Sequence, residues 1–241
     1  HYLRTFDIKS TIISMDNFYR GRDMAPLLPD GTRNYESVEA LHIDKLKLCL
    51  KSLINTGTFS LPVYNFLLGR PEDNEIEHTL SDNEIIIIEG IHALNPIFTS
   101  DISEQNVVKL YVSVKQMIKD ANGEVISPLD IRLVRRIVRD MRERDTVPSK
   151  TLDMWPTVID GENSYIRPYR ISADYTVNSI HIYEPCVFRT IAIPVLRDIA
   201  LDSPNYRKAR DLESRLMRFE PIDPNLVPEN SMLRDFIGSK N

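Results

Sequence analysis

The run Ile85-Ile86-Ile87-Ile88-Glu89-Gly90 is the strongest structural signal in the 241-residue sequence. Four consecutive β-branched residues without polar alternation are typical of a central strand in a parallel sheet, which is covered on both faces. Asp82-Asn83 before the run and Gly90 after it favour turns. We therefore expect a strand over residues 85–88 that is buried on both faces and has Glu89 at its carboxyl end.

Three further segments are strand candidates, and one of them also ends in a carboxylate. Residues 11–15 form a short, mainly apolar run that is directly followed by Asp16. The other two candidates are residues 107–114 and 175–177. In α/β proteins, ligands bind beyond the carboxyl ends of parallel strands. The sequence therefore predicts that chemistry occurs near Asp16 and Glu89.

Apolar spacing and capping residues predict helices between these strands. Apolar residues recur at 3,4,3 spacing from Ile43 to Leu53, and Gly57 follows as a stop signal. Ser127-Pro128, with Asp130 three residues after the serine, is a helix start. Helices are expected over residues 37–56, 130–145, 181–201 and 205–219. Strands that alternate with helices predict an α/β fold with a doubly wound parallel sheet and flanking helices.

The composition excludes several classes of protein. With 42% hydrophobic and 27% charged residues, the chain is typical of a soluble globular protein. Its 30 Lys+Arg and 35 Asp+Glu give a net charge of −5, which disfavours direct binding of nucleic acid or an anionic membrane. Cys49 and Cys186 are too few for a disulfide scaffold or a zinc site, so we expect a reducing, cytoplasmic location.

Asp16 and Glu89 would lie at the same edge of the predicted sheet. Two carboxylates at one edge suit a site that holds Mg²⁺ and deprotonates a hydroxyl group. The alternative is that they only begin the loops after the strands, because strand ends are often polar. Spacing alone leaves both explanations open.

The helix expected over residues 130–145 carries six arginines and four acidic residues, and six minus four leaves a local surplus of two positive charges. A row of arginines can bind polyphosphate oxygens bidentately, and the absence of Lys favours this geometry. The alternative is a solvated face with ion pairs such as Arg136 with Asp140. The arginines predicted to lie away from the apolar stripe include Arg132, Arg135, Arg136 and Arg139.

Two aromatic residues flank an amide in Tyr64-Asn65-Phe66, within a loop-like stretch that ends at Gly69. Such a group can stack on a planar ring and form hydrogen bonds with it. Tyr64 and Phe66 can equally be plain core residues. Residue type alone does not separate these alternatives.

Seven stretches, in order, resemble the uridine kinase/phosphoribulokinase family. They resemble more closely the nucleoside kinase domain at the C-terminal end of bacterial proteins whose N-terminal part is similar to the TGS region of threonyl-tRNA synthetase. The stretches are ISMDNFYR (13–20), NYESVEAL (34–41), LPVYNF (61–66), IIIIEGIHALNP (85–96), DIRLVRRIVRDMRER (130–144), TLDMWP (151–156) and VPENSMLRDFIG (227–238). The resemblance implies a P-loop kinase-like fold with an Arg-rich lid helix. It implies one domain over residues 1–241, with residues 221–241 as a tail packed on it.

The resemblance also implies roles for individual residues. Asp16 would take the proton from the 5′-hydroxyl of a nucleoside, and Glu89 would orient Mg²⁺. Tyr64 and Phe66 would enclose the base. The remaining substrate-binding residues would be Glu36, Asn65 and Arg132, and the phosphate-binding residues would be Arg135, Arg136 and Arg139. Asn65 and Glu36 each stand where uridine kinases usually have Asp, which leaves the exact nucleoside open.

No G-x-x-x-x-G-K-[ST] segment occurs in the chain, although relatives of this family build their phosphate site on that loop. The resemblance places the loop upstream of residues 11–15. We therefore expect a first strand and P-loop, and a fused TGS-like region, before His1 in the gene product. We also expect little kinase activity from this chain alone.

The implied function is phosphorylation of the 5′-hydroxyl of a uridine-like nucleoside by ATP or GTP with Mg²⁺. One alternative is a kinase for another small alcohol, as in the phosphoribulokinase and pantothenate kinase branches. The other is a non-catalytic nucleotide-binding module. The expected partner is the nucleoside, with a homo-oligomer as an open expectation.

Overall fold

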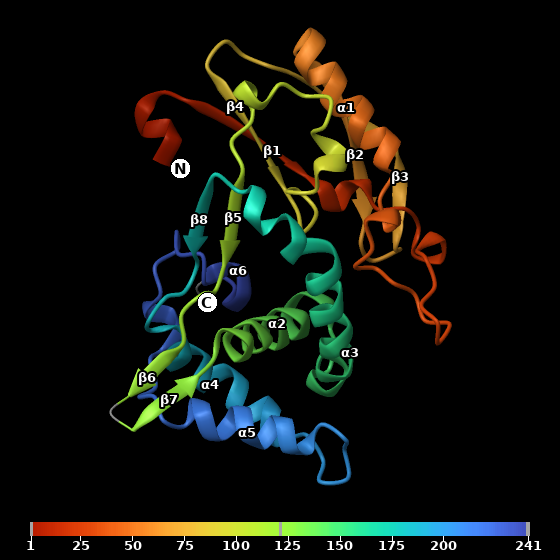
Figure 1. The fold of residues 1–241 in the computed structure, drawn as a ribbon. Coiled ribbons are helices and arrows are strands. Elements are labelled where there is room, and N and C mark those ends of the chain that lie inside the picture. The colour runs from red at the N-terminus through yellow and green to blue at the C-terminus, as the bar shows by residue number, and fades with distance from the viewer. Residues whose placement is uncertain (1, 121, 240–241) are drawn as a thin grey trace. The chain divides into compact units, whose positions relative to one another are not determined.

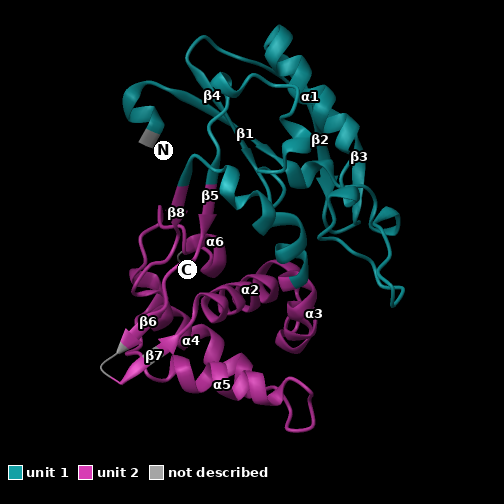
Figure 2. Ribbon diagram, in the orientation of Figure 1, with its two compact units in different colours: residues 1–110, 160–175 teal, residues 111–159, 176–241 magenta. Residues whose placement is uncertain are grey.

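A computed structural model describes residues 2–120 and 122–239, and it mixes helices and strands along the whole chain (Figure 1). This confirms the α/β class. The chain divides into two compact units (Figure 2): unit 1 comprises residues 1–110 and 160–175, and unit 2 comprises residues 111–159 and 176–241. Each unit has its own hydrophobic core. None of the helices in the described ranges is long and apolar enough to span a membrane.

Unit 1 is built on two strand pairs and one long helix. Its main elements are β1 (Lys9–Ser14), the 3₁₀ turn η2 (Met15–Phe18), α1 (Ile43–Thr56), β2 (Thr58–Asn65), β3 (Arg70–Thr79) and β4 (Glu84–Glu89). Strands β1 and β4 run parallel, with Ser14 opposite Glu89. Strands β2 and β3 form an antiparallel hairpin. Unit 1 also contains two helical turns from the later part of the chain, Glu162–Ile166 and Arg167–Ser172.

One face of the β1–β4 pair is buried and the other is exposed. Ile13 packs against Leu46 and Leu50 of α1 in the core of unit 1. By contrast, Ile12 and Ile85 are 61% and 44% exposed. Side chains alternate between the two faces of a strand, so the residues that point away from α1 remain exposed. The prediction that residues 85–88 are buried on both faces is therefore wrong.

The β2–β3 hairpin corrects the loop-like interpretation of the stretch that ends at Gly69. Strand β2 continues through Pro62, and the register shifts between Pro62 and Tyr64. Proline is tolerated at such an irregularity because it cannot donate to a regular ladder. Gly69 has a φ of 67° in the connecting turn, a conformation that glycine adopts without strain.

Helix α1 ends as expected but begins later. Gly57 follows it with a φ of 72°, which is the left-handed glycine stop predicted from the sequence. The helix begins at Ile43 rather than near residue 37, because residues 38–40 form a separate 3₁₀ turn. Ser37 caps that turn by accepting a hydrogen bond from the backbone N–H of Glu39.

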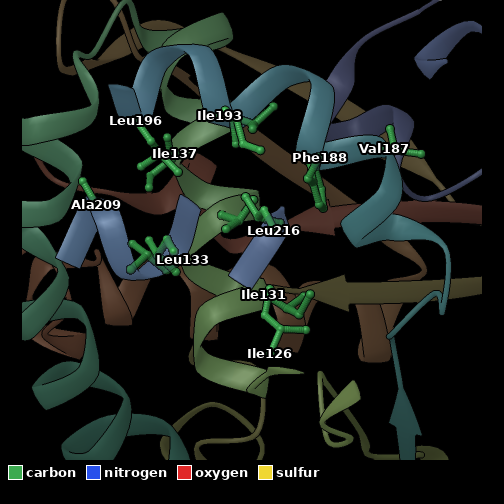
Figure 3. Packing of buried hydrophobic residues seen from close by; sticks show 14 of the residues in the cluster. Ile126, Ile131, Leu133, Ile137, Val187, Phe188, Ile193, Leu196, Ala209 and Leu216 are labelled. Atoms are coloured by element: carbon green, nitrogen blue, oxygen red, sulfur yellow. The ribbon is translucent and has the colours of Figure 1, made fainter. Parts of the chain in front are cut away.

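Unit 2 is mainly helical. The elements that lie wholly or mostly in it are β5 (Leu110–Ser113), β6 (Ile118–Asp120), β7 (Gly123–Ile126), α2 (Pro128–Arg144), α3 (Pro148–Gly161), β8 (Tyr175–Asn178), α4 (Glu184–Arg197), α5 (Tyr206–Leu216) and α6 (Arg234–Ile237). The predicted start of α2 is confirmed, because Ser127 and Asp130 form a complete capping box. Side chains of α2, α4 and α5 meet in the core of this unit, among them Ile137, Ile193 and Leu216 (Figure 3). Leu233 from the C-terminal tail is fully buried in the same core.

The strands of the described residues form four two-stranded sheets rather than one continuous sheet. The pairs are β1–β4, β2–β3, β5–β8 and β6–β7. The β1–β4 pair is parallel, while the β2–β3 and β6–β7 pairs are antiparallel. The parallel pair is the one that positions the residues predicted to carry chemistry.

A buried ion pair joins α2 to α4 inside unit 2. The Nε of Arg135 lies 2.7 Å from one carboxylate oxygen of Glu184, and its Nη2 lies 2.9 Å from the other. The same Nη2 also donates to the backbone carbonyl of Ser179 at 2.6 Å. The Glu184 side chain is fully buried and that of Arg135 is 8% exposed. Breaking such a pair leaves a charge without compensation in the protein interior.

We expect Glu184→Gln to lower the free energy of unfolding of unit 2 by about 3 kcal/mol, because the buried guanidinium of Arg135 loses its counter-charge. Urea denaturation followed by the fluorescence of Trp155, the single tryptophan, reports on unit 2. Asp211→Asn is the matched control, because Asp211 pairs with Arg215 with side chains 46% and 33% exposed. The control should cost less than about 0.5 kcal/mol. Equal losses in the two variants would contradict this account of the buried pair.

Candidate functional site

The carboxyl ends of β1 and β4 lie at one edge of their parallel pair. Glu89 ends β4 opposite Ser14, and Asp16 follows two residues later in η2. Gly90 has a φ of 154°, and a Cβ built on it would lie 2.7 Å from the Cβ of Met15. The chain after β4 thus passes directly against the residue that precedes Asp16. The two segments that carry the predicted carboxylates are therefore neighbours.

The donor set at this edge fits a magnesium ion that arrives with a nucleotide. Mg²⁺ in phosphoryl-transfer sites is held by one or two carboxylates, with phosphate oxygens and waters as the other ligands. Asp16 and Glu89 supply such carboxylates. Within residues 2–120 and 122–239, no group of three or more His, Cys, Asp or Glu side chains is placed to hold a metal ion by itself. The edge therefore suits a shared ion and not a closed protein cage.

Aromatic side chains that directly follow η2 or lie at the end of β2 gather near the turn that carries Asp16. The rings of Tyr64 and Phe66 lie 5.0 Å apart, edge to face, and those of Tyr19 and Tyr64 lie 6.1 Å apart. The backbone N–H of Tyr64 donates to the side chain of Asn17 at 3.4 Å, which ties β2 to the turn that carries Asp16. The sequence pattern did not single out Tyr19, although it lies in the ISMDNFYR stretch.

Tyr64 and Phe66 differ in exposure. Tyr64 is 9% exposed, and its burial raises the pKa of its hydroxyl group. Phe66 is 51% exposed. Tyr64 is thus part of the packed interior, as the core alternative predicts, whereas Phe66 presents its ring at the surface.

Asn65 organises the hairpin turn. Its side-chain carbonyl accepts a hydrogen bond from the backbone N–H of Leu68 at 3.0 Å, and its amide donates to Glu72 at 3.1 Å. Alternation along β2 also points Asn65 away from the face that carries Tyr64. These contacts account for Asn65 as a turn residue, and we do not keep it among the substrate-binding residues.

Glu36 lies in a short turn that a buried histidine supports. The backbone N–H of Glu36 donates to the side chain of Asn34 at 3.1 Å. His92, three residues after Glu89, is 1% exposed, and neither of its ring nitrogens has a hydrogen bond of normal geometry to the described residues. The backbone carbonyl of Glu36 lies close to this ring. Burial lowers the pKa of His92 from 6.5 to about 4, so the ring is neutral at physiological pH. Sequence spacing did not indicate that His92 is buried beside the turn of Glu36, because burial of a single histidine leaves no periodic pattern.

Arginines of helix α2, in unit 2, surround one buried carboxylate of the same helix. Asp140 is 1% exposed, and guanidinium nitrogens of Arg136, Arg139 and Arg144 lie 3.3, 3.8 and 3.1 Å from its oxygens. Three positive charges against one negative charge leave a local surplus of two. Burial and the nearby charge of Arg144 lower the pKa of Arg139. The surplus charge suits a multivalent anion such as a polyphosphate.

The structure changes the predicted role of Arg135 and gives Arg132 an aromatic neighbour. Arg135 is buried, and its donors are used by Glu184 and Ser179, so the prediction that it binds phosphate is corrected to a structural role. Its position on the helix faces α4, which the apolar pattern alone did not reveal. Arg132 lies over the ring of Trp155, with its guanidinium carbon 5.9 Å from the ring centroid.

The predicted site residues fall into two groups. Unit 1 holds the carboxylates and aromatic residues predicted to handle the nucleoside: Asp16, Glu36, Tyr64, Asn65, Phe66 and Glu89. Unit 2 holds the cationic ones: Arg132, Arg135, Arg136 and Arg139. Within unit 1, the structure brings together the segments of Asp16, Glu89 and Tyr64.

The carboxylates at the ends of two parallel strands, with aromatic residues on the neighbouring hairpin, are the candidate ligand site of this α/β fold. Residues 7–183 match the sequence profile of the Phosphoribulokinase / Uridine kinase family. The chain belongs to this family.

Two uridine kinases that are similar in sequence agree with the family match. The uridine kinase of Psychromonas ingrahamii is 32% identical over 168 residues, which are 69% of this chain and 70% of that protein. The uridine kinase of Macrococcus caseolyticus is 29% identical over 167 residues, or 69% of this chain and 72% of that protein. A solved structure described as a possible uridine kinase from Bacillus stearothermophilus aligns with a TM-score of 0.45 at 14% identity and covers 73% of this chain and 76% of that chain.

We expect stability to fall as the pH drops from 6.5 toward 4, because of His92. The unfolded ring takes up a proton below about pH 6.5, whereas the folded ring stays neutral down to about pH 4. The unfolded state therefore binds more protons in this window, which costs up to about 3 kcal/mol at its lower end. NMR titration of the imidazole proton, assigned with His92→Gln, measures the pKa, and thermal denaturation compares the two proteins across the window. A wild-type ring that titrates near pH 6.5 would contradict this.

We expect Gly90→Ala to lower the free energy of unfolding by about 3 kcal/mol. The added Cβ must overlap Met15 while the backbone holds a φ of 154°. Gly31→Ala is the matched control, because Gly31 also has a positive φ, 82°, but nothing lies within 4 Å of its Cβ position. It should cost about 1 kcal/mol from the backbone alone. Thermal denaturation compares the two, and equal costs would argue against close packing at the strand ends.

Proposed function

We propose that this protein is a nucleoside kinase that transfers the γ-phosphoryl group of ATP, or of GTP, to the 5′-hydroxyl of a uridine-like nucleoside. The observation that carries the proposal is the register of Ser14 with Glu89, which places the Asp16 segment beside the end of β4. Membership of the phosphoribulokinase/uridine kinase family supports it. Relatives named as uridine kinases support the nucleoside class.

Asp16 is the general base in this proposal. Its carboxylate accepts the proton of the nucleoside hydroxyl as that oxygen attacks the γ-phosphorus. The bond between this phosphorus and the β–γ bridging oxygen breaks, and the nucleoside diphosphate leaves. Glu89, from the neighbouring strand end, would hold Mg²⁺ together with the nucleotide phosphates. When bound, that ion supplies neutralisation of the phosphate charge.

The aromatic cluster binds the base. The exposed ring of Phe66, with the buried ring of Tyr64 behind it at an edge-to-face separation of 5.0 Å, offers an apolar wall that a planar ring can pack against. Tyr19 extends this wall, and its hydroxyl group donates to the backbone carbonyl of Tyr35 at 3.3 Å. That bond links the base-binding residues to the turn of Glu36, which contacts the ribose in this proposal. An aromatic wall favours a nucleoside over a sugar phosphate or another small alcohol.

Arg136 and Arg139 bind the phosphates. They share the buried carboxylate of Asp140 with Arg144, so their charge exceeds what this carboxylate compensates. Such guanidinium groups stabilise negative charge that develops on a transferred phosphoryl group. Arg132 is kept as a ribose contact, whereas Arg135 is not part of the phosphate set.

A non-catalytic nucleotide-binding module is the second candidate. The surplus positive charge around Asp140 supports it, because such a group binds the phosphates of a nucleotide whether or not a phosphoryl group is transferred. Both candidates bind a nucleoside at the same edge. Phosphorylation of uridine by the natural gene product separates them.

We expect Asp16→Asn in the natural gene product to lower turnover of uridine by about 10³-fold, because the amide cannot accept the proton. The dissociation constant for uridine should change less than about threefold, because the amide keeps the size and shape of the carboxylate. Steady-state kinetics and isothermal titration calorimetry measure the two effects.

Asp101→Asn is the control for the loss of a carboxylate in unit 1. Asp101 is exposed and accepts a hydrogen bond from Ser100, away from the strand ends. This variant should turn over uridine at the normal rate. Unchanged turnover in Asp16→Asn would remove Asp16 from the role of base.

A further inference from the structure

His92 is the most deeply buried histidine among the residues that the structure describes, and it has no settled partner. It is 1% exposed, and neither ring nitrogen has a hydrogen bond of normal geometry. Buried polar groups in folded proteins are almost always hydrogen-bonded, so an exception calls for a reason. Its neutral ring carries one N–H donor and one acceptor, and the backbone carbonyl of Glu36 is the acceptor close to it.

Tyr165 connects this histidine to the same turn from a distant part of the sequence. Its ring stands edge to face on His92, with centroids 6.0 Å apart and an interplanar angle of 78°. Its hydroxyl group accepts a hydrogen bond from the side-chain amide of Asn34 at 3.4 Å. Asn34 in turn accepts the backbone N–H of Glu36 at 3.1 Å. A chain of contacts therefore runs from His92 through Tyr165 and Asn34 to Glu36.

The back of the same turn is closed by Gly161. A Cβ at this position would lie 2.5 Å from the Cβ of Glu36, so the backbone of residue 161 packs directly on that side chain. Glu36 is thus held on one side by Gly161, while His92 lies close to its backbone carbonyl. The position of the Glu36 residue therefore depends on Gly161 and on the neighbourhood of His92.

We propose that His92 and Tyr165 are positioning residues that fix the Asn34–Glu36 turn, so that the Glu36 carboxylate distinguishes the hydroxyl groups of the ribose. The ring N–H of His92 donates to the Glu36 carbonyl when the nucleoside is bound. Hydrogen bonds of this kind are often long in unliganded sites and shorten in the complex. This inference rests on the proposed function, because it assigns the selectivity of the same nucleoside site.

Affinities for three nucleosides test this inference in the full natural protein. Uridine, 2′-deoxyuridine and 3′-deoxyuridine are titrated by calorimetry into the wild type, His92→Phe, His92→Asn and Tyr165→Phe. We expect His92→Phe to weaken uridine binding about tenfold and to weaken binding of at least one deoxynucleoside much less, because Glu36 no longer reads the missing hydroxyl. His92→Asn, which keeps a donor and an acceptor, should recover part of this selectivity.

Steady-state kinetics adds a readout that packing alone does not move. In His92→Phe the KM for uridine should rise about tenfold while kcat changes less than about threefold, because Asp16 and Glu89 are untouched. His92→Phe combined with Glu36→Gln should lose no more selectivity than Glu36→Gln alone, since both changes act through one carboxylate.

Two control variants separate positioning from general loss of stability. Phe98→Leu changes another buried residue of unit 1, which is 5% exposed and belongs to its hydrophobic core. Phe98 is not part of the chain of contacts between His92 and Glu36. Tyr169→Phe removes a hydroxyl group from the same 160–175 segment as Tyr165. Neither should change the preference among the three nucleosides.

The outcomes distinguish this inference from the proposed function. If His92→Phe weakens all three nucleosides by the same factor, or behaves as Phe98→Leu does, His92 is a packing residue and the inference is overturned. If the wild type binds none of the nucleosides, the proposed function itself fails. Wild-type binding of uridine with selectivity lost only in the His92, Tyr165 and Glu36 variants supports both.

Discussion

Parallel strands that pair in register end at the same edge, and in this protein the pairing of Ser14 with Glu89 sets where the two following segments emerge. Each segment begins close to a carboxylate, Asp16 after β1 and Glu89 after β4. The absence of a side chain at Gly90 lets the two segments pass in contact at Met15. A one-residue slip of this register would turn Ile13 out of the core and separate the two carboxylates. The burial of Ile13 against α1 therefore stabilises the fold and the candidate site together.

The chemistry proposed for the nucleoside and the chemistry proposed for the phosphates reside in different compact units. Unit 1 supplies carboxylates and aromatic rings, and unit 2 supplies guanidinium groups. The arginines of α2 also divide by burial. Arg135 is committed to Glu184 inside unit 2, whereas Arg136 and Arg139 share one carboxylate with Arg144. One helix face thus stabilises the fold while the neighbouring positions keep surplus charge for an anion.

Local signals in the sequence predicted the elements that depend on local chemistry. The capping box of α2 and the glycine stop of α1 arise from hydrogen bonds and backbone angles within a few residues, and both were predicted correctly. The β2–β3 hairpin was missed, because a proline such as Pro62 argues against a strand in the sequence and most of β3 is polar and exposed. Burial on one face of β4 was missed, because a run of isoleucines does not reveal which neighbours cover it.

In the candidate site, too, the sequence predicted the features that local patterns determine and missed those that depend on distant residues. Asp16 and Glu89 follow apolar runs, so their common edge could be inferred from the strand pattern. The structural role of Arg135 depends on Glu184, which is distant in the sequence. That of Asn65 depends on which face of β2 its side chain points to. No local sequence pattern indicates either of them. His92 depends on Tyr165 in the same way, because the two residues are 73 positions apart in the chain and no local pattern links them.

The central claim is that unit 1 binds the nucleoside at the carboxyl ends of β1 and β4. NMR spectra of the isotope-labelled chain, recorded during titration with uridine, test this most directly. The account predicts shift changes concentrated in residues 16–19, 34–36, 64–66 and 89–92, with saturation at a single dissociation constant. Saturable changes confined to other residues of the chain, or none up to millimolar uridine, would contradict it.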